Sequence, residues 1–193
     1  HAGYAYSGKT AGRAYGLLAH GDEITRVLVL APSHRHRFRG IDVGRFRAFQ
    51  TPVGDIPVDR TVCQDLLEAL PGLVSAQAEV HEGEHAIEVQ LPLLQVACPH
   101  ANLVPILCGA CNREDSALIV DALTRIAAPA KDNLWVVSSD LTHYGTAFGY
   151  APFSEPVGPR IEELDRGALA LCLAQDPEGF RDYISRTGMT ACG

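Results

Sequence analysis

Side chains that can bind a metal ion or move a proton follow three apolar stretches of this chain. They are His34 and His36, Cys108 and Cys111, and Asp140 and His143. Further candidates lie outside these stretches, at His1, His85, Glu88 and Cys192. Histidine, cysteine and aspartate gathered at one place are what a transition-metal site with acid–base helpers needs. Unrelated polar loop ends would produce the same pattern, so spacing alone leaves both interpretations open.

A rigid element must present each of these groups, and the stretch before His34 is the clearest example. Val27–Ala31 is a continuous apolar run, which is typical of a buried strand in a parallel sheet. Pro32 then ends the strand because it has no N–H for the ladder. Ligands of open α/β sheets bind beyond the carboxyl ends of the strands. We therefore expect His34 at the edge of the sheet where chemistry takes place.

Strand and helix patterns alternate along the rest of the chain. Buried strands are expected at 103–108 and 134–138, and helices at 10–18, 60–70, 84–97, 116–126, 161–173 and 177–185. Between the first strand and the second helix, we expect a loop and edge strand over 38–49 and a turn at 51–55. Asp59 is a suitable N-cap for the second helix. The alternation predicts an α/β fold with a mostly parallel sheet and helices on both faces, in three α/β/α layers. We expect a single domain over residues 1–193.

Composition excludes several classes of protein. The chain has 193 residues and a formal net charge of −7, so it lacks the basic surface of a nucleic-acid-binding domain or of a protein that binds anionic membranes. No apolar run reaches the ~18 residues of a membrane span. The 6 cysteines show no disulfide framework. These features favour a globular cytoplasmic protein with reduced thiols.

Two short motifs suggest other chemistry. Gly3–Thr10 matches G-x-x-x-x-G-K-T, the phosphate-binding loop of NTPases, but no strand precedes it and two tyrosines crowd the loop. Cys108 and Cys111 form a C-x-x-C pair, but the pair follows a strand and does not begin a helix that would activate the first thiol. We expect Lys9 not to bind nucleotide phosphate and the cysteine pair not to bind metal.

Six ordered sequence blocks resemble the Memo family, also called the B component of the AmmeMemoRadiSam system. They are His1-Ala-Gly-Tyr-x-Tyr-Ser-Gly8, Pro32-Ser-His34, Thr51-Pro52-x-Gly-Asp55, Glu84-His85-x-Ile-Glu88-x-x-Leu91-Pro92, Ser138-Ser-Asp140-x-x-His143-Tyr-Gly145 and Thr190-Ala-Cys192-Gly193. The resemblance covers essentially the whole chain. The family is similar in fold to the class III, LigB-type extradiol dioxygenases, which use non-haem iron(II).

The resemblance implies metal ligands at His1, His34 and Cys192, with His85, Asp140 and His143 lining the pocket. Where extradiol dioxygenases use a carboxylate, the third ligand here is a thiol. Iron(II) is the expected metal, and the soft thiolate is also compatible with copper or zinc. The family pattern continues beyond both ends of this sequence, so we expect a chain trimmed at His1 and Gly193.

The resulting prediction is a metal-dependent, dioxygenase-like oxidoreductase. His143 would act as general acid or base, His85 would position an oxygen atom of the substrate, and Asp140 would orient a neighbouring group. The alternative is a non-catalytic module that binds a peptide or protein in the same pocket, with a phosphate-loop NTPase as a remote third option. The ligand is an unidentified small molecule or peptide, and the AMMECR1-like and radical SAM proteins of the same system are candidate partners.

Overall fold

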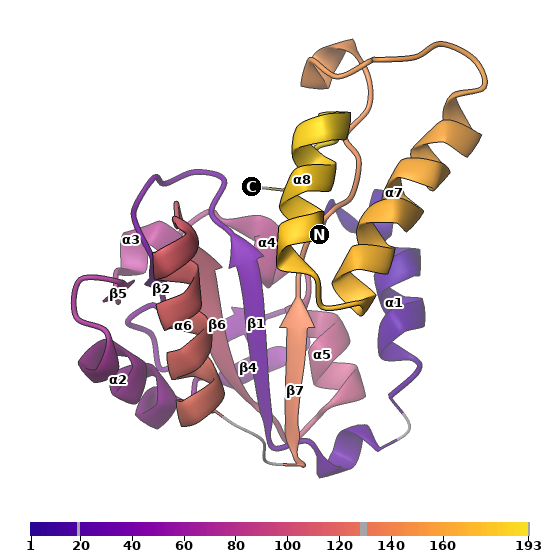
Figure 1. Cartoon of the computed structure of the whole chain (residues 1–193). Helices are drawn as coiled ribbons and strands as arrows, with labels where there is room; N and C mark the ends of the chain where they lie inside the picture. The colour runs from indigo at the N-terminus through magenta and orange to yellow at the C-terminus, as the bar shows by residue number, and fades with distance from the viewer. Residues whose placement is uncertain (19, 128–130, 193) are drawn as a thin grey trace. The chain divides into compact units, whose positions relative to one another are not determined.

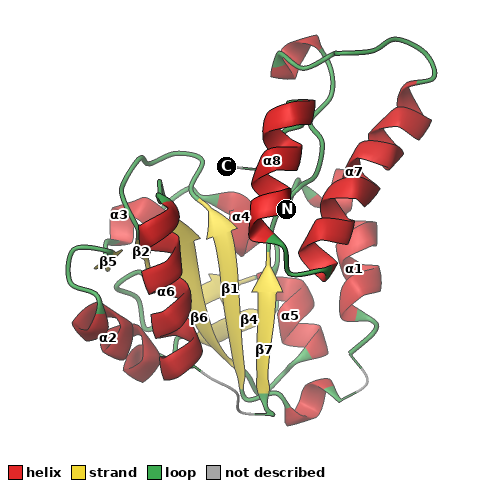
Figure 2. Cartoon of the chain, viewed as in Figure 1, coloured by secondary structure: helices red, strands yellow, loops and turns green. Residues whose placement is uncertain are grey.

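The computed structural model describes residues 1–18, 20–127 and 131–192 (Figure 1). The chain divides into two compact units, His1–Ser138 and Ser139–Gly193. The first unit contains the sheet and most of the helices, and the second contains two long helices and the loops around them (Figure 2). Each unit is described by itself.

The sheet of the first unit has the order β5-β2-β6-β1-β7. Its strands are β1 (Arg26–Pro32), β2 (Ile41–Asp42), β5 (Val74–Ser75), β6 (Asn102–Cys108) and β7 (Asn133–Val137). β1 pairs in parallel with β6 on one side and with β7 on the other, and β2 is parallel to β5 but antiparallel to β6. The predicted α/β fold with a mostly parallel sheet is confirmed.

Alternate residues of β1 face two separate cores, as the pleat of a strand requires. Leu28 packs with residues of α2 (Arg60–Ala69) and α6 (Arg113–Ile126). Val27 and Val29 pack on the other face with residues of α4 (His85–Glu88) and α5 (Leu91–Ala97). Helices therefore cover both faces of the sheet, in the expected three layers (Figure 1).

Capping side chains fix where several helices begin. Asp59 caps α2 by accepting a hydrogen bond from the amide of Val62 at 3.1 Å, as predicted. The predicted helix over 84–97 is instead two short helices, α4 and α5. Glu84 caps α4, and Pro92 lies in the first turn of α5, where a missing N–H costs least.

The loop and edge strand expected over 38–49 contain β2 and the start of β3 (Ala48–Thr51), and the turn expected at 51–55 joins β3 to β4 (Gly54–Pro57) in a hairpin. Other short elements were not predicted: β5, the helix α3 (Ala78–His81) and a single π-helical turn at Tyr4–Gly8 that runs into α1 (Lys9–Tyr15). They are too short to show a hydrophobic period in the sequence, so tertiary contacts decide their conformation.

The second unit consists of the loop after β7, a 3₁₀ turn at Thr146–Phe148, and the helices α7 (Val157–Leu173) and α8 (Pro177–Thr187). The two helices pack at Gly167, where a Cβ atom would lie 2.3 Å from the hydroxyl of Tyr183. Asp176 caps α8 through the amide of Gly179. In the part of the chain that the structure describes, no helix is long and apolar enough to cross a membrane.

Candidate metal centre

Three histidine rings meet in the first unit, although they are far apart in sequence. The ring centroids of His1 and His34 are 5.1 Å apart, those of His34 and His85 are 5.0 Å apart, and those of His1 and His85 are 5.9 Å apart. His34 follows the carboxyl end of β1 and His85 begins α4. The approach of His1 and His34 that the resemblance implies is therefore observed.

Glu84 holds the ring of His34. Its carboxylate accepts hydrogen bonds from the backbone amide of His34 at 2.6 Å, from Nδ1 of the same ring at 3.0 Å, and from the amide of Ala86 at 3.0 Å. A carboxylate can only accept, so Nδ1 of His34 carries the hydrogen. In the neutral ring, the lone pair is then on Nε2, which is the nitrogen able to bind a metal.

Glu84 is buried, with only 1% of its side chain exposed, yet its negative charge is stabilised. Burial alone raises the pKa of this carboxyl. The hydrogen bonds from His34 and Ala86 outweigh burial, and the net pKa lies below its ordinary value. Ligand atoms of His34, Glu84 and His85 lie within 4.8 Å of one another. We assign Glu84 to orienting His34, because the backbone amide and ring Nδ1 of His34 both donate to its carboxylate.

His1 is held by a different partner, Ser138, which directly follows β7. Nδ1 of His1 lies 3.1 Å from the hydroxyl of Ser138. Both residues are buried. Sequence reasoning identified the histidines but not Glu84 or Ser138, although the N-cap position of Glu84 before His85 was a usable signal.

The other predicted functional residues lie together in the second unit. Ligand atoms of Asp140, His143 and Cys192 are within 4.8 Å of one another. Nε2 of His143 is 3.6 Å from the Cys192 thiol, and Nδ1 of the same ring is 3.3 Å from the carbonyl of Thr190. A carbonyl only accepts, so Nδ1 carries the hydrogen and Nε2 faces the thiol as an acceptor. This places a base beside Cys192.

The predicted ligand set therefore draws on both units. His1 and His34 are neighbours in the first unit, and Cys192 lies beside His143 and Asp140 in the second. That Cys192 shares one metal with His1 and His34 stays a prediction.

The two competing motifs have unsuitable local structure. The amides of Tyr6 and Ser7 donate to the carbonyl of Gly3, so the Gly3–Thr10 segment is helical and its amides do not line a phosphate cradle. Burial, followed by the proximity of Cys111, raises the pKa of Cys108 to about 11, which keeps this thiol protonated at neutral pH. Among the described residues, no cluster of potential metal ligands includes either of these cysteines.

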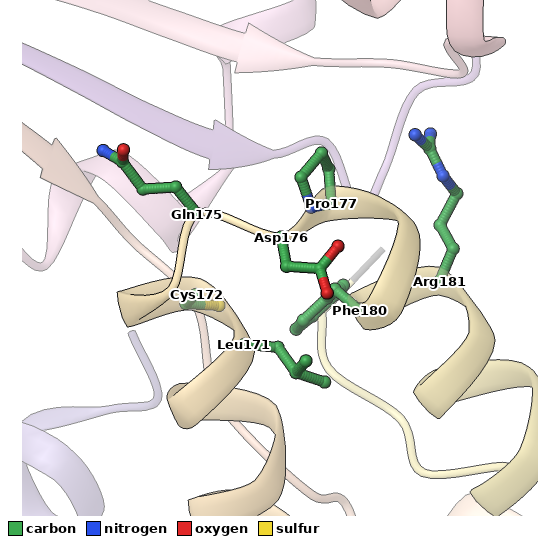
Figure 3. A pocket seen from close by; sticks show the side chains of 7 residues that line it. All are labelled: Leu171, Cys172, Gln175, Asp176, Pro177, Phe180 and Arg181. Atoms are coloured by element: carbon green, nitrogen blue, oxygen red, sulfur yellow. The ribbon is translucent and has the colours of Figure 1, made fainter.

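A hollow of ≈ 470 Å³ lies where α7 joins α8 in the second unit (Figure 3). Its lining is mainly apolar and consists of Leu171, Cys172, Gln175, Asp176, Pro177, Phe180 and Arg181. None of the candidate metal ligands or acid–base residues lines it. The side chain of Asp176 already caps α8. The hollow therefore has no arrangement of groups that could carry out the predicted chemistry.

Comparison with known proteins finds relatives that match the whole of this chain. A MEMO1 family protein of Schizosaccharomyces pombe is 32% identical over 222 residues, which cover 100% of this chain and 71% of that protein. The memo-1 homolog of Caenorhabditis elegans is 29% identical, with 100% and 56% covered, and a MEMO1 family protein of Thermococcus onnurineus is 30% identical, with 100% and 69% covered. The profile of the family described as Memo-like protein matches residues 1–193, and the chain belongs to this family.

Proposed function

We propose that this chain is a metal-dependent oxidoreductase that holds one transition-metal ion through His1 and His34. The main support for the proposal is the cluster of the His1, His34 and His85 rings, whose centroids lie within 5.9 Å of one another. Beside them, the buried carboxylate of Glu84 orients the ring of His34. Histidine rings packed for structural reasons alone do not need a buried charge to set their tautomer. A carboxylate that hydrogen-bonds a ligating histidine is a recurrent feature of metal sites.

The donor set fits a redox-active metal. Neutral imidazoles bind iron, copper and zinc, and a thiolate adds preference for softer ions. Cys192 is the third ligand that the family resemblance implies. Its thiol must lose a proton to bind metal, and Nε2 of His143 lies 3.6 Å away as the acceptor of that proton. When bound, the metal would supply the electron transfer that none of these side chains provides.

The remaining candidate residues have roles compatible with their surroundings. His85 is exposed and stacks on His34 with 20° between the ring planes, so its ring can donate a hydrogen bond to an oxygen of the substrate. His143 would exchange protons with the substrate or with Cys192, and Asp140 would orient its neighbours. Binding of the AMMECR1-like and radical SAM proteins, and a cytoplasmic location, remain proposals from the resemblance.

Metal analysis of anaerobically purified full-length protein tests the proposal. We expect close to one ion of iron, copper or zinc per chain, lost in His34→Gln. The matched control is His36→Gln, which changes an exposed histidine in the same loop and should leave the metal content unchanged. Equal binding by wild type and His34→Gln would contradict the site. Metal binding without consumption of dioxygen, in the presence of a reductant, would favour the binding-module alternative over an oxidoreductase.

A further inference from the structure

The ring of His1 ends a chain of hydrogen bonds that begins on α1. The hydroxyl of Tyr15 donates to Oε1 of Gln90 at 2.9 Å, and Nε2 of Gln90 donates to Oγ of Ser138 at 2.9 Å. The hydroxyl of Ser138 donates to the carbonyl of Ala86 at 2.7 Å. Nδ1 of His1 lies 3.1 Å from the same serine oxygen. The chain of contacts is mostly buried and crosses from α1 to the end of β7.

The carbonyl of Ala86 determines where the hydrogens of this network lie. The carbonyl of Ala86 cannot donate, so the single hydroxyl hydrogen of Ser138 must point to it. Oγ of Ser138 then has two lone pairs left, and among the described residues its two remaining hydrogen-bond neighbours are Nε2 of Gln90 and Nδ1 of His1. Both of these nitrogens must donate. Nδ1 of His1 therefore carries a hydrogen.

The opposite orientation of the Gln90 amide does not satisfy the same contacts. It would place Oε1 of Gln90 against Ser138, so that this oxygen and the carbonyl of Ala86 would compete for one hydroxyl hydrogen. Leaving a buried acceptor unsatisfied is costly. In the described part of the chain, no fully buried side-chain nitrogen or oxygen lacks a partner. The orientation with Tyr15 donating to Gln90 is thus the consistent one.

We infer that Ser138, held by Gln90 and Tyr15, is a positioning residue that fixes His1 as the Nδ1–H tautomer. The lone pair of the neutral ring is then on Nε2, which makes Nε2 the nitrogen that can bind metal. This inference adds detail to the proposed metal site, and the function of the tautomer rests on the proposed metal binding. Glu84 imposes the same tautomer on His34, but Ser138 does so without adding a negative charge. A charged acceptor, Glu84, therefore orients His34, and a neutral acceptor, Ser138, orients His1.

Nitrogen-15 NMR of histidine rings in full-length, metal-free protein tests the inference directly. In spectra recorded at alkaline pH, each nitrogen of a neutral ring reports whether it carries a hydrogen. His1→Asn assigns the signals of His1 among the 8 histidines. We expect hydrogen on Nδ1 of His1 in the wild type. Hydrogen on Nε2 would overturn the inference, and this measurement needs no variant that could misfold.

Variants then test whether Ser138 is the cause. Ser138→Ala should convert His1 to a mixture of tautomers, Ser138→Thr should restore Nδ1–H, and Tyr15→Phe should give a smaller shift in the same direction. Ser139→Ala is the matched control, because the hydroxyl of Ser139 donates to the carbonyl of Asp140 and has no place in the network. An unchanged His1 tautomer in folded Ser138→Ala would overturn the assigned role.

A zinc titration separates this inference from the proposed function. Ser138→Ala should weaken zinc binding ~10–100-fold, the usual effect of losing an outer partner of a metal ligand. If the wild type binds no zinc, iron or copper but His1 keeps a Ser138-dependent Nδ1–H, the proposed function is wrong and the tautomer assignment stands. If metal binds while His1 carries its hydrogen on Nε2, the proposed metal site stands and the tautomer assignment is wrong.

Discussion

The carboxylate of Glu84 bonds to His34 twice, through the backbone amide at 2.6 Å and through ring Nδ1 at 3.0 Å. These two contacts fix both the position of the residue and the orientation of its ring. The same carboxylate caps α4 through Ala86. One buried side chain therefore connects the end of β1, the start of α4 and the candidate ligand His34.

Replacing Glu84 should affect stability and metal binding together. In Glu84→Gln the negative charge is lost, and one of the two oxygens becomes an amide nitrogen that cannot accept. We expect metal affinity to fall ~10–100-fold and the free energy of unfolding to fall by about 1–2 kcal/mol through the weakened cap. Urea unfolding and a metal titration measure the two effects.

Glu88→Gln is the control for that experiment, because Glu88 is exposed on the same short helix. It should leave both quantities close to the wild-type values. A Glu84→Gln protein that binds metal as tightly as Glu88→Gln would show that His34 does not depend on this carboxylate.

A second buried carboxylate, Asp42 on β2, should make stability depend on acid pH. Asp42 accepts hydrogen bonds from the amides of Gly44 and Gln77, the hydroxyl of Ser75 and Nε2 of His81, which lies 3.0 Å away. Burial raises the pKa of Asp42, but these bonds outweigh it and the net pKa lies below the ordinary 3.8. The carboxylate thus binds its proton more readily in the unfolded chain than in the folded one.

The sign of the pH effect follows from this lowered pKa. The stabilisation by Asp42 is fully present above its unfolded pKa and is lost as pH falls through the lower folded value. We expect the free energy of unfolding to decrease as pH is lowered below about 4. Asp42→Asn should flatten this slope and destabilise the protein by ~1–3 kcal/mol at neutral pH, since buried donors lose their acceptor. The check is urea unfolding at a series of pH values, with Asp55→Asn on the exposed hairpin as control. An unchanged slope in Asp42→Asn would contradict the assignment.

The parts of the fold that sequence reasoning predicted are those in which local and tertiary preferences agree. The runs in β1 and β6 are apolar throughout because both faces are covered, and Asp59 marks the start of α2 by a local hydrogen bond. β2 was predicted only as part of a loop and edge strand over 38–49. It is the short pair Ile41–Asp42, within a stretch rich in arginine, and it lies between β5 and β6 and not at the edge of the sheet.

In the candidate site, too, features set by local sequence were predicted and features set by tertiary contacts were not. The apolar strand before His34 predicted its place at the edge of the sheet, and the family resemblance implied that His1 joins it there. The partners Glu84 and Ser138 were not predicted, because their role depends on the directions of side chains that only the folded backbone sets. Gln90 is a further case, since the helix expected over 84–97 is interrupted beside it and its amide is directed to Ser138.

Nucleotide binding by the N-terminal glycine motif is expected to be absent. The Tyr4–Gly8 turn continues directly into α1, so the amides that a phosphate would need are used within the helix. Isothermal titration of the wild-type protein with ATP and magnesium should give no heat of binding in the micromolar range. Micromolar binding that Lys9→Ala abolishes would restore the NTPase interpretation.

The choice among the cysteines is the most direct test of the predicted ligand set. The thiol of Cys192 lies beside the base His143, whereas burial keeps Cys108 protonated, with its pKa raised to about 11. A thiolate adds negative charge to two neutral imidazoles and should contribute much of the affinity for a soft ion. Cys192→Ser should therefore weaken metal binding by at least ~10-fold, because losing only an outer partner of a ligand already costs ~10–100-fold. The double variant Cys108→Ser/Cys111→Ser should titrate like the wild type. If the double variant loses metal while Cys192→Ser keeps full stoichiometry and affinity, the thiol ligand has been assigned to the wrong part of the chain.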